Sequence, residues 1–118
     1  MIYIASPYTH KDKAIEEKRF VEVAKATAHF VKKGAMAFSP IVHGHSLVEF
    51  GGLDGMDEHN WLDYDFKFLE MSALLLVLAI DGWEESRGVR AEIAFAKRHG
   101  VDRMMTRPPL YKLERLKD

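Results

Sequence analysis

The sequence predicts an α/β fold: a doubly wound sheet of four to five mostly parallel strands, with helices on both faces. Short β-prone runs alternate with helix-length amphipathic segments along the 118 residues, as in successive β-α-β units with right-handed crossovers. One run, residues 74–80, is apolar without a break, which is typical of a strand covered on both faces. We therefore expect a three-layer α/β/α arrangement and a single domain spanning residues 1–118.

Four short β-prone runs are expected to form the strands. They comprise residues 2–5, 35–38, 74–80 and 103–106. A turn signal closes each run, and these signals are Ser6-Pro7, Ser39-Pro40, Asp81-Gly82 and Pro108-Pro109. We expect the stretch from Ser39 to Gly55 to be a long mobile loop, and the residues after Pro109 to be a polar tail.

Three segments between these strands have the pattern of helices. They comprise residues 12–33, 57–71 and 86–99. In the first, apolar side chains fill one half of the helical wheel, and Gly34 follows as a left-handed residue after the helix end. Asp57 and Ser86 are suited to cap the amino ends of the other two helices.

Composition and charge exclude several classes of function. Cysteine is absent, which removes disulfides, thiolate metal sites and cysteine nucleophiles and makes the cytoplasm the expected location. The longest uncharged apolar stretch, residues 71–80, is half of what a membrane-spanning helix requires, so we expect no membrane contact and no targeting segment. Residues 34–96 carry 11 acidic and 3 basic side chains, which disfavours polymeric nucleic acid as a partner.

Ligands of doubly wound sheets bind outside the carboxyl ends of the strands, where three polar segments of this chain meet. They are residues 6–9, 39–45 and 81–92. In the third segment, the Ser86 hydroxyl and the amides of Gly88 and Val89 lie at a helix start, where a phosphate can bind. The alternative is an ordinary capped helix, with Glu92 as a first-turn acid favoured by the helix dipole.

Asp65 is the second candidate because it shares one helical face with Trp61 and Phe68. Desolvation between aromatic side chains would raise its pKa, as a proton donor that works near neutral pH requires. Asp63 is expected to point elsewhere, toward solvent. The alternative for Asp65 is a partly exposed acid with no chemical role.

The histidine pair His43-x-His45, together with His10 and His59, raises a metal hypothesis, because imidazoles two residues apart can point to one side. No cysteine, HExxH spacing or clear third ligand accompanies the pair, so we expect no metal and take His43 as a substrate contact. A Ser-His-Asp hydrolase is excluded because no G-x-S-x-G elbow follows a strand.

Several aromatic side chains lie near the expected strand ends, where they can stack on a nucleobase or pack into the core. They are Tyr3, Tyr8, Trp61 and Trp83. We expect Tyr8 and Trp83 to face a cleft, because both fall in expected loops.

Four segments follow one another in a recognisable order. They are Tyr3-Ile4-Ala5-Ser6-Pro7-Tyr8, Ser39-Pro40-Ile41-x-His43, Trp61-x-x-x-Asp65 and Gly82-Trp83-x-x-Ser86-x-Gly88-Val89-x-x-Glu92-Ile93-x-x-Ala96. In this order they resemble the nucleoside 2-deoxyribosyltransferase-like superfamily, most closely a small bacterial and phage branch of it. The resemblance covers residues 3–100 and implies a flavodoxin-like parallel sheet, assembly as a dimer or tetramer, and no cofactor.

By position, the resemblance makes Glu92 the nucleophile at the sugar C1′ and Asp65 the residue that assists proton transfer at the leaving base. Transferases of free nucleosides typically have an aspartate at the position of Ser86, whereas the 5′-monophosphate hydrolases have a serine. A carboxylate there would repel phosphate, so Ser86 favours a nucleotide. The residues expected to contact substrate are Ser6, Tyr8, His43, Trp83, Ser86, Gly88 and Val89.

The resemblance therefore implies an N-glycosidase of nucleoside 5′-monophosphates, with base exchange between deoxynucleosides and non-catalytic nucleotide sensing as alternatives. Its two carboxyl groups are expected about 5 Å apart. We expect opposite pKa shifts, with Glu92 kept ionised by the helix dipole and Asp65 pushed toward its protonated form. Ser72-Ala73 replaces a usual alanine-aspartate pair, and the loop at residues 51–55 is unlike that of the hydrolases, so base specificity is not implied.

Overall fold

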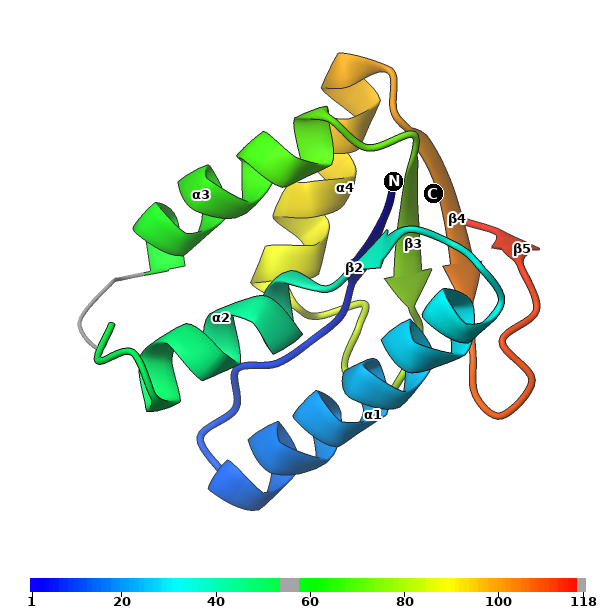
Figure 1. Cartoon of the computed structure of the whole chain (residues 1–118). Helices are drawn as coiled ribbons and strands as arrows, with labels where there is room; N and C mark the ends of the chain where they lie inside the picture. The colour runs from blue at the N-terminus through cyan, green and yellow to red at the C-terminus, as the bar shows by residue number, and fades with distance from the viewer. Residues whose placement is uncertain (54–57, 117–118) are drawn as a thin grey trace.

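The computed structural model describes residues 1–53 and 58–116, without the side chains of residues 58 and 59. Within these residues, one sheet has the strand order β2-β1-β3-β4-β5 (Figure 1). The strands are β1 Ile2–Ala5, β2 Ala37–Phe38, β3 Leu74–Leu78, β4 Asp102–Thr106 and β5 Glu114–Arg115. The first four are parallel, and β5 pairs antiparallel with β4. The order reverses between β1 and β3, which confirms the doubly wound α/β prediction.

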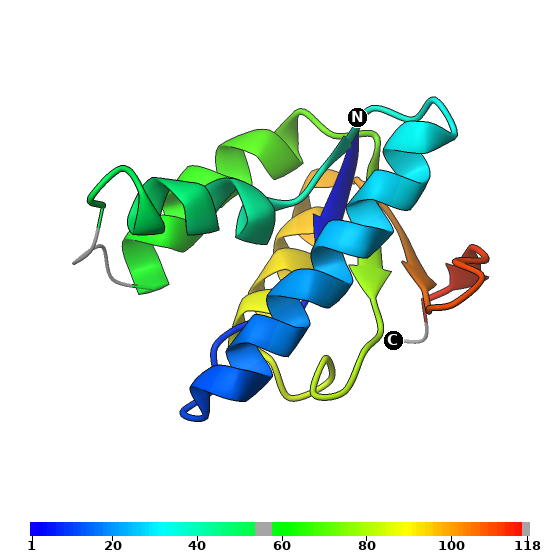
Figure 2. The same ribbon diagram turned by 60° about the horizontal axis from the view of Figure 1, so that its bottom comes forward.

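The helices of the described residues cover both faces of this sheet. They are α1 Lys13–Lys32, α2 Pro40–Glu49, α3 Glu58–Glu70 and α4 Arg87–His99. Figures 1 and 2 show α1 on one side of the sheet and α3 and α4 on the other. Helix α2 lies between α1 and α3, because His45 stacks on Phe20 of α1 and His43 bonds Tyr64 of α3.

Alternation along the strands divides the core into two layers. On one face, Tyr3 and Leu75 pack with Phe95 and other apolar side chains of α3 and α4. On the other face, Ile4 and Leu76 pack with apolar side chains of α1. The strands are thus buried on both sides, as the unbroken apolar run of β3 indicates.

The prediction of a mobile loop from Ser39 to Gly55 is wrong for most of that stretch, because helix α2 occupies residues 40–49. The Ser39 hydroxyl accepts a hydrogen bond from the Val42 amide at 3.1 Å, and Pro40 stands at the start of the helix. Serine as cap and proline in the first turn are both favourable at a helix start. The same dipeptide therefore closes β2 and opens α2.

The remaining helix boundaries agree with the sequence prediction, with one exception outside the described residues. The Asp12 carboxylate caps α1 by accepting a hydrogen bond from the Ala14 amide at 3.0 Å. Gly34, with a φ of 92°, has the expected left-handed conformation after α1. Asp57, the expected cap of α3, lies outside the described residues.

The carboxyl-terminal segment contains a strand that the sequence analysis missed. We expected a polar tail, but β5 pairs with β4 through Met104 opposite Arg115 and Met105 opposite Glu114. The strand has only two residues and both are charged, so it has no apolar period to recognise.

No helix among the described residues is both long enough and apolar enough to cross a membrane.

The layer under α1 yields a test of the packing. Leu76 is fully buried, whereas Leu110 is 67% exposed. We expect Leu76→Ala to lower the free energy of unfolding by about 2–5 kcal/mol, because it leaves a cavity in the core. The same change at Leu110 should cost less than about 0.5 kcal/mol. Urea denaturation of both variants measures this, and equal losses would contradict the assignment of Leu76 to the core.

Candidate functional site

Three titratable side chains meet on the face of the sheet that α3 and α4 cover. They are Tyr3 from β1, Asp65 from α3 and Glu92 from α4, and none is more than 9% exposed. The Tyr3 hydroxyl donates a hydrogen bond to Glu92 Oε2. Burying a carboxyl group is costly unless it is paired, and such clusters are concentrated at functional sites. These three residues, which we call the buried acid cluster, are the core of the candidate site.

The local sequence explains how these polar groups enter the interior. Strand alternation turns Tyr3 toward the face that Leu75 also lines. Glu92 stands three residues after Val89 and three before Phe95, within the buried stripe of α4. Helical spacing therefore carries the carboxyl inward together with its apolar neighbours. In the same way, Asp65 lies one turn before the fully buried Leu69 of α3.

The raised pKa predicted for Asp65 is confirmed in direction. Burial raises the pKa of its carboxyl from 3.8 to about 7. Its Oδ1 atom is buried and has no hydrogen-bond partner among the described residues, so nothing there favours the charged form over the protonated one. Asp63 is exposed, as expected.

The pKa expected for Glu92 is wrong in direction. Burial raises the pKa of this carboxyl from 4.5 to about 8; the Tyr3 hydrogen bond opposes the rise, and the charge of Asp65 adds to it. Glu92 lies in the second turn of α4, and the first turn contains no acidic residue. The helix dipole acts within the first turn, so it neither keeps Glu92 ionised nor makes it a capping acid.

The sequence analysis names Tyr3 only as an aromatic side chain for stacking or core packing and misses its place beside the two acids. Burial, together with Glu92 and Asp65, raises the pKa of its hydroxyl well above 10. The hydroxyl therefore keeps its proton and remains a donor. One signal was available, because a tyrosine in a buried strand needs a partner for its hydroxyl, but no local pattern identifies that partner as Glu92.

At the start of α4, the expected phosphate contacts form a helix cap. Ser86 Oγ accepts a hydrogen bond from the Val89 amide at 3.2 Å, which is the capping alternative. The hydroxyl still has a proton to donate. Within the described part of the chain, a Cβ on Gly88 would meet Ser86 Oγ alone within 4 Å, at 3.9 Å, so the backbone at Gly88 is open to a close approach.

Two loops leave the carboxyl edge of the sheet beside this helix start. Ser6 follows β1 and is buried, and its hydroxyl has no hydrogen-bond partner among the described residues. Tyr8, on the same loop, is half-buried. Trp83 follows β3 and packs, half-buried, against the apolar cluster on the α3 and α4 side. Because β1 and β3 are neighbours, both loops lie at the same edge of the sheet.

His43 lies in helix α2 and not in a loop. Its Nε2 and the Tyr64 hydroxyl are 2.8 Å apart, and its ring contacts Phe38 and Phe68. Phe38 in turn contacts Tyr3. His43 therefore belongs to an aromatic cluster that adjoins the buried acid cluster.

The other histidines of the metal hypothesis have separate partners. His45 Nε2 lies 2.7 Å from a carboxylate oxygen of Glu49, and His10 Nδ1 accepts from the Asp12 amide. The side chain of His59 is outside the described part. Within that part, no three histidine, aspartate or glutamate side chains converge as metal ligands.

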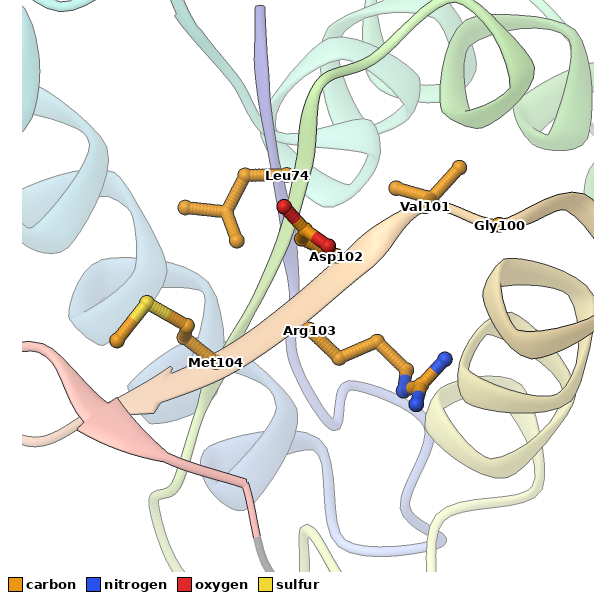
Figure 3. A pocket seen from close by; sticks show the side chains of 6 residues that line it. All are labelled: Leu74, Gly100, Val101, Asp102, Arg103 and Met104. Atoms are coloured by element: carbon orange, nitrogen blue, oxygen red, sulfur yellow. The ribbon is translucent and has the colours of Figure 1, made fainter.

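A hollow of about 570 Å³ lies at the opposite edge of the sheet (Figure 3). It is lined by Leu74 and by residues 100–104, around the amino ends of β3 and β4. Asp102 and Arg103 are successive strand residues, so their side chains leave opposite faces and do not converge on one ligand (Figure 3). The hollow therefore provides no chemistry comparable to that of the buried acid cluster.

The chain belongs to the DUF1937 family, described as a domain of unknown function, whose sequence model matches residues 1–106. The match includes the buried acid cluster and the start of α4. No curated protein matches the chain.

The raised pKa values predict how stability depends on pH. The folded chain binds the protons of Asp65 and Glu92 more tightly than the unfolded chain, where the pKa values are ordinary. Their contribution to stability is therefore complete below about pH 4 and is lost as the pH rises through about 7 and 8. We expect the free energy of unfolding, measured in urea, to fall across this range.

Glu92→Gln should make this fall shallower, because the amide does not titrate, whereas the same change at the exposed Glu85 should leave it unaltered. An unchanged slope in Glu92→Gln would contradict the raised pKa of this group.

Proposed function

We propose that the chain is an N-glycosidase that cleaves nucleoside 5′-monophosphates into a free base and a sugar phosphate. The observation that carries the proposal is the buried acid cluster, in which two carboxyl groups from different helices interact. Retaining glycosyl transfer uses two carboxyl groups, one as nucleophile and one as proton donor. The resemblance to the nucleoside 2-deoxyribosyltransferase-like superfamily supports the same two residues, Glu92 and Asp65.

Glu92 is the proposed nucleophile. Its Oε2 accepts from Tyr3, which leaves Oε1 for attack on C1′ of the sugar. The tyrosine bond fixes the orientation of the carboxyl group and favours its ionised form. As the bond from Glu92 to C1′ forms, the bond from C1′ to the base breaks and its electron pair leaves with the base.

Asp65 is the proposed proton donor to the departing base. In the second step, water attacks C1′ of the glycosyl ester, Asp65 accepts a proton from that water, and the Glu92 carboxylate is released. One water is consumed, and both carboxyl groups return to their starting states.

The reaction needs the proton on Asp65, whereas without substrate the pKa of Glu92 is the higher of the two. Bound substrate reverses the order of these two pKa values, so that Asp65 holds the proton. Asp65 Oδ1 has no hydrogen-bond partner among the described residues, so a base nitrogen that accepts a hydrogen bond from protonated Asp65 stabilises the protonated form. Positive charge that develops at C1′ stabilises ionised Glu92 in the same way. The proton that the two carboxyl groups share is thereby held on Asp65, the proposed proton donor.

The 5′-phosphate is proposed to bind at the start of α4. Ser86 Oγ–H and the amides of Gly88 and Val89 are neutral donors at a helix amino end, where an anion is favoured. Binding there exchanges the Ser86 cap on Val89 for contacts with phosphate. The Ser6 hydroxyl supports this placement, because it is buried without a partner among the described residues and a buried polar group without a partner is costly.

The proposed function predicts loss of turnover in Glu92→Gln. The wild-type chain should release free base from at least one member of a panel of nucleosides and 5′-monophosphates, detected by chromatography. Glu92→Gln should abolish release while keeping nucleotide affinity within about tenfold, because it deletes a nucleophile and preserves shape. Glu85→Gln is the control and should retain full activity.

Full activity in Glu92→Gln would remove this residue from the mechanism. Product that forms only when a second base is supplied would indicate base exchange. Nucleotide binding without any release of base would indicate a non-catalytic sensor.

The phosphate placement predicts a change of preference in Ser86→Asp. The new carboxylate would repel a phosphate at the start of α4 but would still cap the helix. We expect 5′-monophosphates to lose affinity by at least about tenfold more than the matching free nucleosides. Calorimetric titration of both ligand classes measures this, and equal losses would contradict the placement.

A further inference from the structure

Arg19 of α1 joins two loops that are far apart in the sequence. Its Nη1 donates to the main-chain carbonyls of Thr9 at 3.0 Å and Tyr8 at 3.5 Å, in the loop after β1. Its Nη2 donates to the carbonyl of Asp81 at 3.4 Å, in the loop after β3. One guanidinium group therefore bonds both loops.

Gly82 shows that the loop after β3 is shaped around this guanidinium. Its φ is 90°, a conformation that other residues rarely adopt. A Cβ at this position would lie 2.3 Å from Arg19 Nη2, which no side chain can accommodate without displacing the arginine or the loop. The backbone conformation thus favours glycine here, and the absence of a Cβ leaves the guanidinium in its observed place.

The planar, forked geometry of arginine suits this task. Its N–H groups point in several fixed directions, so that separate nitrogens reach the two loops, whereas the single ammonium group of lysine has no such fork. The described partners of Arg19 are main-chain carbonyls. Its role is therefore to fix the backbone of the loops and not to pair with a particular side chain.

The two loops carry the residues proposed to contact substrate from either side. Ser6 and Tyr8 lie on the first loop, and Trp83 and Ser86 lie on the second. The loops leave β1 and β3, between which the strand order reverses and where ligands of such sheets bind. The distance between the loops therefore sets the width of the site.

We propose that Arg19 is a positioning residue, which couples the loops after β1 and β3 and holds them at the separation that substrate requires. The inference rests on the proposed function for its kinetic consequence, but the coupling of the loops is independent of that function. Misplacing substrate contacts by about 1 Å can cost about a hundredfold in rate, so loss of the coupling between the loops should have a measurable effect on the rate.

The coupling is tested by hydrogen exchange of the backbone amides, followed by mass spectrometry without substrate. Arg19→Gln and Arg19→Lys should both accelerate exchange in residues 8–12 and in residues 81–86. Gly82→Ala displaces the Arg19 guanidinium from the loop after β3 and should accelerate exchange in the same two segments. Lys18→Gln, which removes an equal charge from the neighbouring exposed position, is the control and should change neither segment.

The kinetic consequence is tested on a nucleotide that the wild-type chain cleaves. Arg19→Gln and Arg19→Lys should lower kcat/KM by at least about tenfold, and the pH values at which the rate changes should stay constant, because the buried acid cluster is untouched. Lys18→Gln should retain the wild-type rate.

Faster exchange in only one loop, or an unchanged kcat/KM in Arg19 variants that remain folded, would overturn the proposal. A wild-type chain that cleaves no nucleotide would overturn the proposed function instead, and the exchange experiment would still decide whether Arg19 couples the loops. If Arg19 variants fail to fold, Gly82→Ala decides the matter, since exchange confined to its own loop contradicts the coupling.

Discussion

The hydrogen bond from the Tyr3 hydroxyl to the Glu92 carboxyl is the interaction on which the rest of the site depends. Glu92 is held in a layer built mainly of apolar side chains, where an unpaired carboxyl is costly in either protonation state. Tyr3 supplies the partner from a strand 89 residues away in sequence. Because β1 is an inner strand between β2 and β3, and α4 packs on the adjoining strands β3 and β4, the orientation of this carboxyl is set by the core of the fold.

A second carboxyl in the same layer changes what the first can do. Burial raises the pKa of both Asp65 and Glu92, so the pair resists carrying two negative charges and retains a proton near neutral pH. A pair that shares one proton needs no external acid or base to begin a glycosyl transfer. The cost is stability. The unfolded chain gives up these two protons at lower pH than the folded chain does, so rising pH favours unfolding.

The sequence predicted the fold better than it predicted the site, and the difference has a physical cause. Strands and helices can be recognised from local hydrophobic periodicity and from the turn and cap residues that bound them. The bounds predicted for β1, β3, α1 and α4 are therefore close to those observed. Helix α2 was missed because Ser39-Pro40 serves equally well to end a strand and to start a helix. The partner of Tyr3 was missed because a contact across 89 residues leaves no trace in local spacing, and the pKa of Glu92 was misjudged because burial, which depends on packing, outweighs the helix dipole.

The structure separates the groups proposed to do chemistry from those proposed to select the substrate. Tyr3, Asp65 and Glu92 lie on a strand and two helices, whose positions are fixed by the core. Ser6, Tyr8, Trp83 and Ser86 lie on or beside loops, where substitutions perturb packing least. Such loops can be remodelled to admit a different base or sugar without disturbing the acids, provided that their mutual distance is kept. Arg19 and Gly82 supply that constraint from outside the acid cluster, which gives a reason for an arginine in α1 whose bonds within the described residues end on loop backbone.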